Sequence, residues 1–158
     1  IVFAGGCFWG VEAYFKQIPG VTETTVGYIS GPGKTTYEEV CNASGHAEAV
    51  HITFDEDVIS LKKLLDLVFN IIDPTAINRQ GMDVGVQYRT GIYNYTPEMY
   101  DLIRGYINVR QKEYVAAIMI ELKTNLEFYN AEEYHQDYLG KHKHGYCHVD
   151  LKSYKKIK

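Results

Sequence analysis

The sequence predicts an α/β protein of the α+β type, in which helices cover a mixed sheet in a two-layer sandwich. Short apolar or alternating stretches, typical of strands, take turns with stretches of helical periodicity, and glycine or proline separates most of them. No repeat and no low-complexity linker interrupts the 158 residues, of which 46% are apolar. A chain of this length and composition is expected to form one domain, residues 1–158, around one core.

Each element follows from a local signal. Strands are expected at 1–4, 21–29, 48–54, 91–95 and 116–122. Helices are expected at 8–18, 60–69, 97–114 and 132–139, with Ser60 and the Thr96-Pro97 pair as start signals. The resulting order, strand-helix-strand-strand-helix-strand-helix-strand, favours a ferredoxin-like centre. The polar stretch 73–89 is expected to be a functional loop, and 140–158 a mostly coiled C-terminal segment that carries Cys147.

Charge and hydropathy exclude several classes of partner. The formal net charge is −4 and no long basic run is present, so no nucleic-acid partner is expected; the basic residues of 152–158 are interpreted as a solvated tail. No apolar run approaches the roughly 20 residues of a membrane span, and no signal peptide is recognisable, so the expected location is cytoplasmic. The chain opens at Ile1 rather than Met, so an upstream targeting sequence or fused domain would be invisible here.

The stretch Gly5-Gly6-Cys7-Phe8-Trp9-Gly10 is the most unusual in the chain and lies at a predicted strand-to-helix junction. The helix dipole favours a thiolate at this position, but its contribution of roughly 0.3–2 kcal/mol lowers the pKa of a thiol by only about one unit. The electrophile must therefore be activated too, which requires an acid. The alternative is that Cys7 is an ordinary buried core residue. The three cysteines, an odd number, are expected to be reactive thiols rather than to form structural disulfides.

The hexapeptide resembles the active-site signature of the A-type peptide methionine sulfoxide reductases. Further blocks are similar to that family in the same order and cover nearly the whole chain: 26–28, 37–41, 45–50, 78–89, 128–136 and 145–147. The resemblance implies reduction of methionine S-sulfoxide, both protein-bound and free, with no bound cofactor. Family precedent also allows a fused B-type reductase domain.

The resemblance further implies roles for individual residues. Cys7 would attack the sulfoxide sulfur and become a sulfenic acid, while Glu48 supplies a proton. Tyr28 and Tyr88 would donate hydrogen bonds to the sulfoxide oxygen. Burial is expected to raise the pKa of Glu48, as this role requires.

Phe8 and Trp9 would form an apolar pocket for the substrate methyl group, and Asp83 would position the substrate or the tyrosines. Cys147 would act as the resolving thiol, forming a disulfide with Cys7 that thioredoxin reduces. No cysteine follows Cys147 in this sequence; if the natural protein ends near Lys158, thioredoxin is expected to attack that disulfide directly. Cys41 is interpreted as a structural or back-up thiol.

Three other interpretations remain open at this point. His135, His142, His144, Cys147 and His148 could hold a structural metal, although no second cysteine pair accompanies them, and no metal is predicted. A cysteine hydrolase would use Cys7 with a distant histidine and would have no use for Cys147. A non-enzymatic module that recognises Met side chains would not need Cys7.

Overall fold

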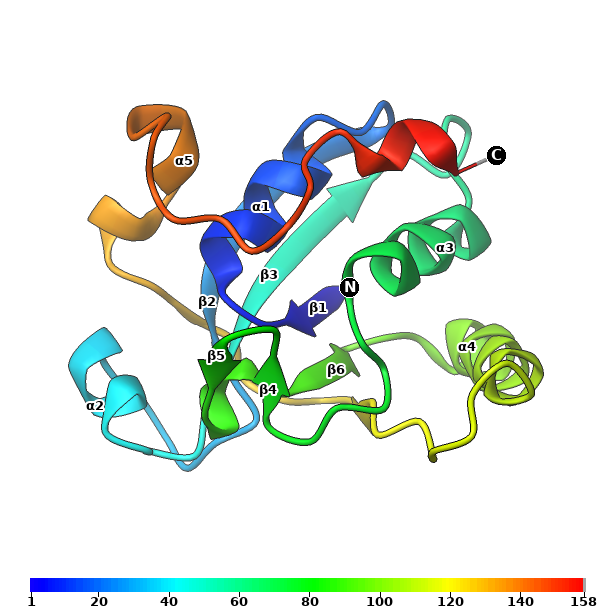
Figure 1. Cartoon of the computed structure of the whole chain (residues 1–158), viewed down its shortest axis with the longest axis horizontal. Coiled ribbons are helices and arrows are strands. Elements are labelled where there is room, and N and C mark those ends of the chain that lie inside the picture. Colours follow the sequence, from blue (N-terminus) through cyan, green and yellow to red (C-terminus); the bar gives the residue numbers. More distant parts are fainter. Residues whose placement is uncertain (158) are drawn as a thin grey trace.

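The computed structural model describes residues 1–157 and contains one six-stranded sheet (Figure 1). Its strands are β1 (Val2–Gly5), β2 (Val21–Ile29), β3 (Ala47–Phe54), β6 (Thr90–Tyr93), β7 (Glu121–Lys123) and β8 (Tyr129–Asn130). They lie in the order β7-β6-β1-β3-β2-β8, and every neighbouring pair is antiparallel except the parallel pair β6 and β7. The sheet is therefore mixed, as the sequence predicts.

The helices are α1 (Phe8–Lys16), α2 (Tyr37–Cys41), α3 (Leu61–Ile71), α4 (Pro97–Gln111) and α5 (Tyr138–Lys141). Short 3-10 turns occur at η1 (Val86–Tyr88), η2 (Glu133–His135) and η3 (Ser153–Lys156), and β4 (Arg79–Gln80) pairs with β5 (Asp83–Val84) in a small hairpin. Ser60 and Thr96 cap α3 and α4 by accepting hydrogen bonds from backbone N–H groups, as expected from the sequence.

Side-chain alternation divides the sheet between two apolar clusters. Helices α1 and α3 cover one face (Figure 1), where Val50 and Ile52 of β3 join the larger cluster. Ala47 and Ala49 point to the other face, which Phe128 and Leu126 cover. Glu48 alternates with these alanines, so it belongs to the helix-covered face. The sheet register thus delivers one carboxyl group beneath the start of α1.

Two expected elements are shorter than predicted. The apolar run 116–122 predicts a strand, but only Glu121–Lys123 pairs with the sheet. The backbone N–H of Ile118 instead donates to Gln111 and that of Met119 to Pro74, which ties this run to α4 and the loop after α3. The expected helix 132–139 is split into η2 and α5, because Asp137 between them adopts a left-handed conformation with φ 53°.

Three short helices lie where none was predicted: α2, η3, and η1 within the stretch 73–89 that was expected to be a loop. Helix α2 forms because Thr36 caps it, accepting a hydrogen bond from the N–H of Glu39. Turn η3 lies in the expected solvated tail and packs against α3: Nζ of Lys63 donates to the carbonyl of Ile157 at 2.7 Å, and Nδ2 of Asn70 to Ser153 at 2.8 Å. The tail is therefore docked as far as residue 157; Lys158 lies outside the described residues.

The four central strands of the sheet are β6, β1, β3 and β2. When α2, the β4–β5 hairpin and η1 are left out, these strands and their helices follow one another as β1-α1-β2-β3-α3-β6. The ferredoxin-like expectation rests on this order. The C-terminal segment, defined here as residues 142–157, runs across α1 toward α3 (Figure 1). In the part of the chain that the structure describes, no helix is both long and apolar enough to cross a membrane.

Candidate active site

Cys7 is the N-cap residue of α1 and is 7% exposed. Gly6 before it has φ +91°, and a Cβ there would come within 2.9 Å of Gln80 and of His148, so this turn requires glycine. The backbone N–H groups of Trp9 and Gly10 face the thiol and lower its pKa. Cys7 thus lies at the helix start, as predicted from the sequence.

The net effect on the Cys7 thiol is nevertheless opposite to the modest activation expected from the sequence. Burial, and after it the carboxylate of Glu48, raises the pKa of Cys7 to about 12. Asp83 adds to this effect. Desolvation and two acidic groups outweigh the helix start because the dipole contributes only about 2 kcal/mol at most. Protonation of Glu48 would therefore remove one of the two negative charges that disfavour the Cys7 thiolate.

Glu48 is 1% exposed, and its Oε1 accepts a hydrogen bond from the backbone N–H of Phe8 at 3.2 Å. Burial raises the pKa of this carboxyl to about 8, against the lowering effect of that N–H, and Asp83 raises it further. Glu48 is thus protonated over much of the neutral range. Its hydrogen bond also places it at the first residue of α1, one residue from the thiol.

Tyr88, in η1, is half-buried and lies close to the charges of this site. Burial raises its pKa, and the charges of Glu48, Cys7 and Asp83 raise it further. Tyr37, the first residue of α2, has the same character: burial, a hydrogen bond with Cys41 and the charges of Glu48 and Tyr88 raise its pKa. Tyr37 was not singled out from the sequence, although it lies within the block 37–41 that is similar to the reductase family.

The hydroxyl of Tyr28 is already engaged. Tyr28 is fully buried, and its O–H donates to Oε1 of Glu132 at 2.8 Å. The other carboxylate oxygen of Glu132 accepts from the backbone N–H of Tyr37 at 3.0 Å. Glu132 therefore joins Tyr28 to the start of α2, and it was not among the residues predicted from the sequence.

Phe8 and Trp9 differ in what they offer to a ligand. Phe8 is 1% exposed beneath the rings of Tyr28, Tyr37 and His135, whereas Trp9 is partly buried. The indole N–H of Trp9 donates to Nδ1 of His135 at 3.0 Å, and its ring stacks on another aromatic ring 3.8 Å away, that of Tyr138. Further aromatic rings thus surround Phe8 and Trp9, and the methyl pocket expected from these two residues stays a prediction.

Asp83 lies on the β4–β5 hairpin, beside the turn that carries Cys7 (Figure 1). Its Oδ2 accepts a hydrogen bond from the hydroxyl of Tyr146 at 3.0 Å. The neighbouring Met82 is 93% exposed and Val84 is 70% exposed, and Tyr146 is also exposed. Met82, Val84 and Tyr146 thus form an exposed apolar rim around Asp83.

Cys147 lies against the first turn of α1: a Cβ added to Gly10 would be 3.2 Å from its Sγ. Its thiol donates to the carbonyl of Val149 at 3.2 Å, and burial raises its pKa. Cys41 is exposed at the end of α2, and all three cysteines are free thiols. The structure therefore brings Cys147 to the helix turn that begins at Cys7.

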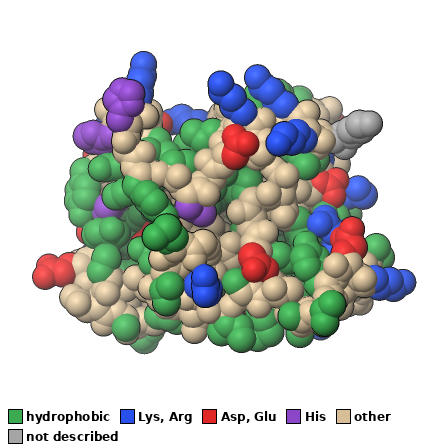
Figure 2. Space-filling view, viewed as in Figure 1, with side chains coloured by type: hydrophobic (Ala, Val, Ile, Leu, Met, Phe, Trp, Pro, Cys, Tyr) green, Lys and Arg blue, Asp and Glu red, His purple; other side chains and the backbone are tan. Residues whose placement is uncertain are grey.

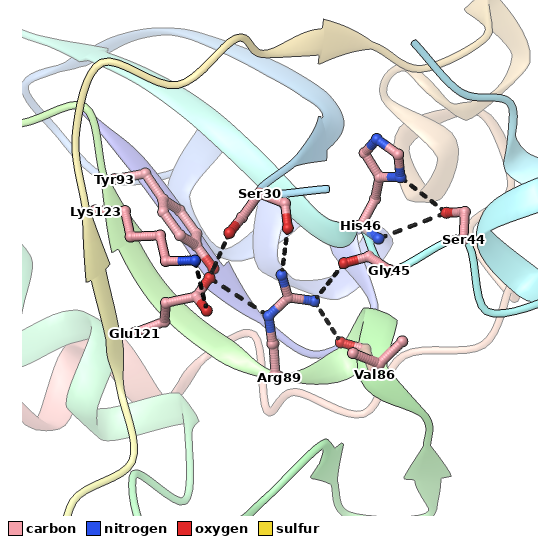
Figure 3. A network of polar contacts seen from close by, with 9 residues as sticks. All are labelled: Ser30, Ser44, Gly45, His46, Val86, Arg89, Tyr93, Glu121 and Lys123. Atoms are coloured by element: carbon pink, nitrogen blue, oxygen red, sulfur yellow. Dashed lines mark hydrogen bonds and ion pairs between the residues drawn. The ribbon is translucent and has the colours of Figure 1, made fainter. Parts of the chain in front are cut away.

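A polar network surrounds Arg89, the residue that follows Tyr88 in the chain (Figure 3). The guanidinium of Arg89 donates to the carbonyls of Ser30 at 2.7 Å, Gly45 at 3.1 Å and Val86 at 3.0 Å. It also pairs with Glu121 at 3.4 Å. Arg89 thus joins η1 to the end of β2 and to the residues that lead into β3.

The histidines do not converge on a metal site. Figure 2 shows histidine side chains in separate places on this face of the molecule. No group of three or more His, Cys, Asp or Glu side chains within residues 1–157 has the arrangement of a metal site.

The chain matches the peptide methionine sulfoxide reductase family over residues 1–158. The chain belongs to this family. It is 54% identical over 153 residues to peptide methionine sulfoxide reductase MsrA of Clostridium tetani (strain Massachusetts / E88), covering 96% of this chain and 93% of that protein. It is therefore an enzyme that reduces methionine sulfoxide, and neither the cysteine hydrolase nor the binding module is supported.

Solved structures of reductases of this type share its fold. Mxr1 from Saccharomyces cerevisiae in its reduced form superposes with a TM-score of 0.84 at 32% identity, covering 95% of this chain and 88% of that one. Methionine sulfoxide reductase A of Corynebacterium diphtheriae gives a TM-score of 0.80 at 31% identity, covering 92% and 76%. The α/β fold with its mixed sheet is thus the fold of methionine sulfoxide reductases.

Proposed function

We propose that this reductase acts on the S epimer of methionine sulfoxide through Cys7 and Glu48. Protonated Glu48 transfers its proton to the sulfoxide oxygen as the Cys7 thiolate attacks the sulfur. The attack forms a transient S–S bond between Cys7 and the substrate. The protonated oxygen then moves to the Cys7 sulfur as the S–O bond of the substrate and the transient S–S bond break, so methionine leaves reduced and Cys7 carries a sulfenic acid. The single observation that carries this proposal is a buried carboxyl of pKa about 8 at the helix start that holds the thiol.

The developing charge on the oxygen needs fixed hydrogen-bond donors. Tyr88 and Tyr37 are suited to this role, since both lie in the field of Glu48. The family resemblance implies Tyr28 as a donor together with Tyr88, but the hydroxyl of Tyr28 donates its hydrogen bond to Glu132. Tyr28 would therefore act indirectly, through Glu132 and the start of α2. Trp9 with Phe8 would receive the methyl group, and Asp83 would position the substrate at the rim.

Cys147 is proposed to resolve the sulfenic acid by forming a Cys7–Cys147 disulfide. Its Sγ lies against the first turn of α1. Thioredoxin or another dithiol would then reduce the disulfide. Both free and protein-bound methionine sulfoxide are expected as substrates, because the exposed rim of Met82, Val84 and Tyr146 offers apolar area to a polypeptide. Residues 1–158 would act as one domain, in the cytoplasm.

The test is one exposure of fully reduced protein to excess methionine S-sulfoxide without a reductant. One methionine per chain and a mapped Cys7–Cys147 disulfide are expected; methionine R-sulfoxide is the stereochemical control and should release none. Cys147→Ser should still release one methionine per chain and then stop. No release from the wild type would disprove the role of Cys7, and a disulfide to Cys41 would disprove that of Cys147.

A further inference from the structure

His148 follows Cys147 and has one nitrogen without a partner. Its Nε2 lies 3.1 Å from the carbonyl oxygen of Gly5. Because a carbonyl oxygen can only accept, Nε2 carries the hydrogen, and Nδ1 of the neutral ring bears a lone pair. That Nδ1 is buried and has no hydrogen-bond partner among the described residues. A buried acceptor without a partner is costly and calls for an explanation.

This nitrogen and the thiol of Cys147 approach the same residue of α1, Gly10. A Cβ built on Gly10 would be 3.2 Å from Sγ of Cys147 and 3.3 Å from Nδ1 of His148, so both atoms border the same point on the first turn of α1. The Gly5 carbonyl that holds the ring belongs to the residue two positions before Cys7. The nucleophile, the second thiol and the unpartnered nitrogen are thus gathered on one short stretch of backbone.

We propose that Nδ1 of His148 accepts the proton of the Cys147 thiol when Cys147 attacks the Cys7 sulfenic acid. This inference rests on the proposed function, in which Cys147 is the resolving residue. The S–H bond of Cys147 breaks, its proton goes to Nδ1, and the sulfur pair forms the S–S bond to Cys7. The S–O bond of the sulfenic acid breaks, and the departing hydroxide takes the proton from the imidazolium and leaves as water. Cys147 is oxidised and the Cys7 sulfur is reduced, so the step needs no further reactant.

Two features of the surroundings favour this step. Burial raises the pKa of the Cys147 thiol, so little thiolate forms without a base. The thiol hydrogen now points to the carbonyl of Val149, so it must rotate about the Cβ–Sγ bond to reach Nδ1. The bond between Nε2 and Gly5 keeps the ring in the required tautomer and orientation, as a second hydrogen bond does for other basic histidines.

The test distinguishes the role of Nδ1 from that of Nε2. Rapid-quench single-turnover experiments on the full chain follow methionine release and disulfide formation independently. His148→Gln keeps an N–H donor at the place of Nε2 but has no base at Nδ1, and His148→Ala removes both. His144→Gln, an exposed histidine of the same segment, is the matched control. We expect both His148 variants to release methionine at the wild-type rate and to form the disulfide roughly 10²-fold more slowly. Free imidazole should restore the rate in His148→Ala.

Three results would overturn the inference. Disulfide formation at the wild-type rate in His148→Gln would reduce His148 to an anchor on Gly5. Equal slowing of methionine release in that variant would assign His148 to supporting the turn that holds Cys7. The same slow disulfide formation in His144→Gln would show that the effect is not specific to His148. A wild type without the Cys7–Cys147 disulfide is a different failure, since it removes the proposed function and the role of His148 with it.

Discussion

Tyr28 and Glu48 lie directly opposite each other on β2 and β3, yet their hydrogen bonds diverge. Glu48 accepts from the backbone of Phe8 at the start of α1, whereas Tyr28 donates away from the thiol, to Glu132. One pair in the sheet register therefore serves both sides of the site: the carboxyl reaches the helix start that holds Cys7, and the phenol reaches the segment that holds α2.

Replacing Glu48 by Gln should separate the acidity of Cys7 from catalysis. Removing the carboxylate removes a charge that raises the pKa of Cys7, so alkylation by iodoacetamide at pH 8 should become faster. Methionine S-sulfoxide reduction should nevertheless fall by about 10²–10⁴-fold, because the proton donor is lost. Glu12→Gln is the matched control, since Glu12, on α1, is buried like Glu48. Slower alkylation in Glu48→Gln would contradict the assigned electrostatics.

The same substitution should change how stability depends on pH. In the unfolded chain Glu48 releases its proton near the ordinary value of 4.5, but in the folded protein it keeps it until about pH 8. The folded state thus binds more protons across this window, so the wild type loses stability relative to Glu48→Gln as the pH rises through it, by on the order of 4–5 kcal/mol. Urea unfolding at pH 5 and pH 8.5 measures the difference, and an equal difference at both values would refute the shift.

Tyr37→Phe and Tyr28→Phe should affect different properties. Loss of the Tyr37 hydroxyl should slow methionine release by roughly 10–10³-fold, as expected for one donor to the oxygen. Loss of the Tyr28 hydroxyl leaves Glu132 with one partner fewer and should lower the free energy of unfolding by about 1–3 kcal/mol, with the smaller kinetic effect. Single-turnover rates and urea unfolding compare the two variants. A larger kinetic loss in Tyr28→Phe would restore the donor role predicted from the sequence.

Gly10→Ala should impair the second half of the cycle alone. The new Cβ would be 3.2 Å from Sγ of Cys147 and 3.3 Å from His148 and Val149, so the C-terminal segment must shift. Methionine release should persist, while disulfide formation slows several-fold. Gly105→Ala in α4 is the control, because a Cβ there meets nothing within 4 Å and alanine favours a helix by about 1 kcal/mol. Unchanged disulfide formation in Gly10→Ala would show that this close approach is not needed.

Arg89→Lys keeps the charge but loses the planar fork that serves three carbonyl groups. A lysine ammonium cannot reach all of them, and each of these partly buried carbonyls left without a partner costs about 1–3 kcal/mol. We expect a drop of about 2–4 kcal/mol in the free energy of unfolding and a lower rate of methionine release, since Tyr88 adjoins Arg89. Arg104→Lys, an exposed change on α4, should alter neither. A fully stable Arg89→Lys variant would disprove the anchoring role.

Local signals predicted the frame of the molecule well. Ser60 and Thr96 cap helices as expected, and the alternation in 48–54 placed β3 correctly to within a residue. Helix α2 was missed because five residues carry too little periodicity to detect. The run 116–120 was misread because its backbone hydrogen bonds go to Gln111 and Pro74, which no local pattern reveals.

The site shows the same division. Cys7 and its helix start follow from neighbouring residues, but the pKa of its thiol depends on Glu48 and Asp83, which only the folded chain brings close. The link from Tyr28 through Glu132 to Tyr37 spans more than 90 residues and has no signal in the sequence. The unpartnered nitrogen of His148 likewise exists only because Gly5 holds the ring.

The C-terminal segment is fastened at its far end, where Ser153 and Ile157 bond to α3. Only a short stretch after α5 is therefore free to move Cys147, which confines its thiol to a small volume around the first turn of α1. Such confinement corresponds to a local thiol concentration in the millimolar range or above. A sulfenic acid on Cys7 would thus be captured before a second oxidant molecule could convert it irreversibly to a sulfinic acid, so that an enzyme of oxidative repair is itself shielded from oxidative loss.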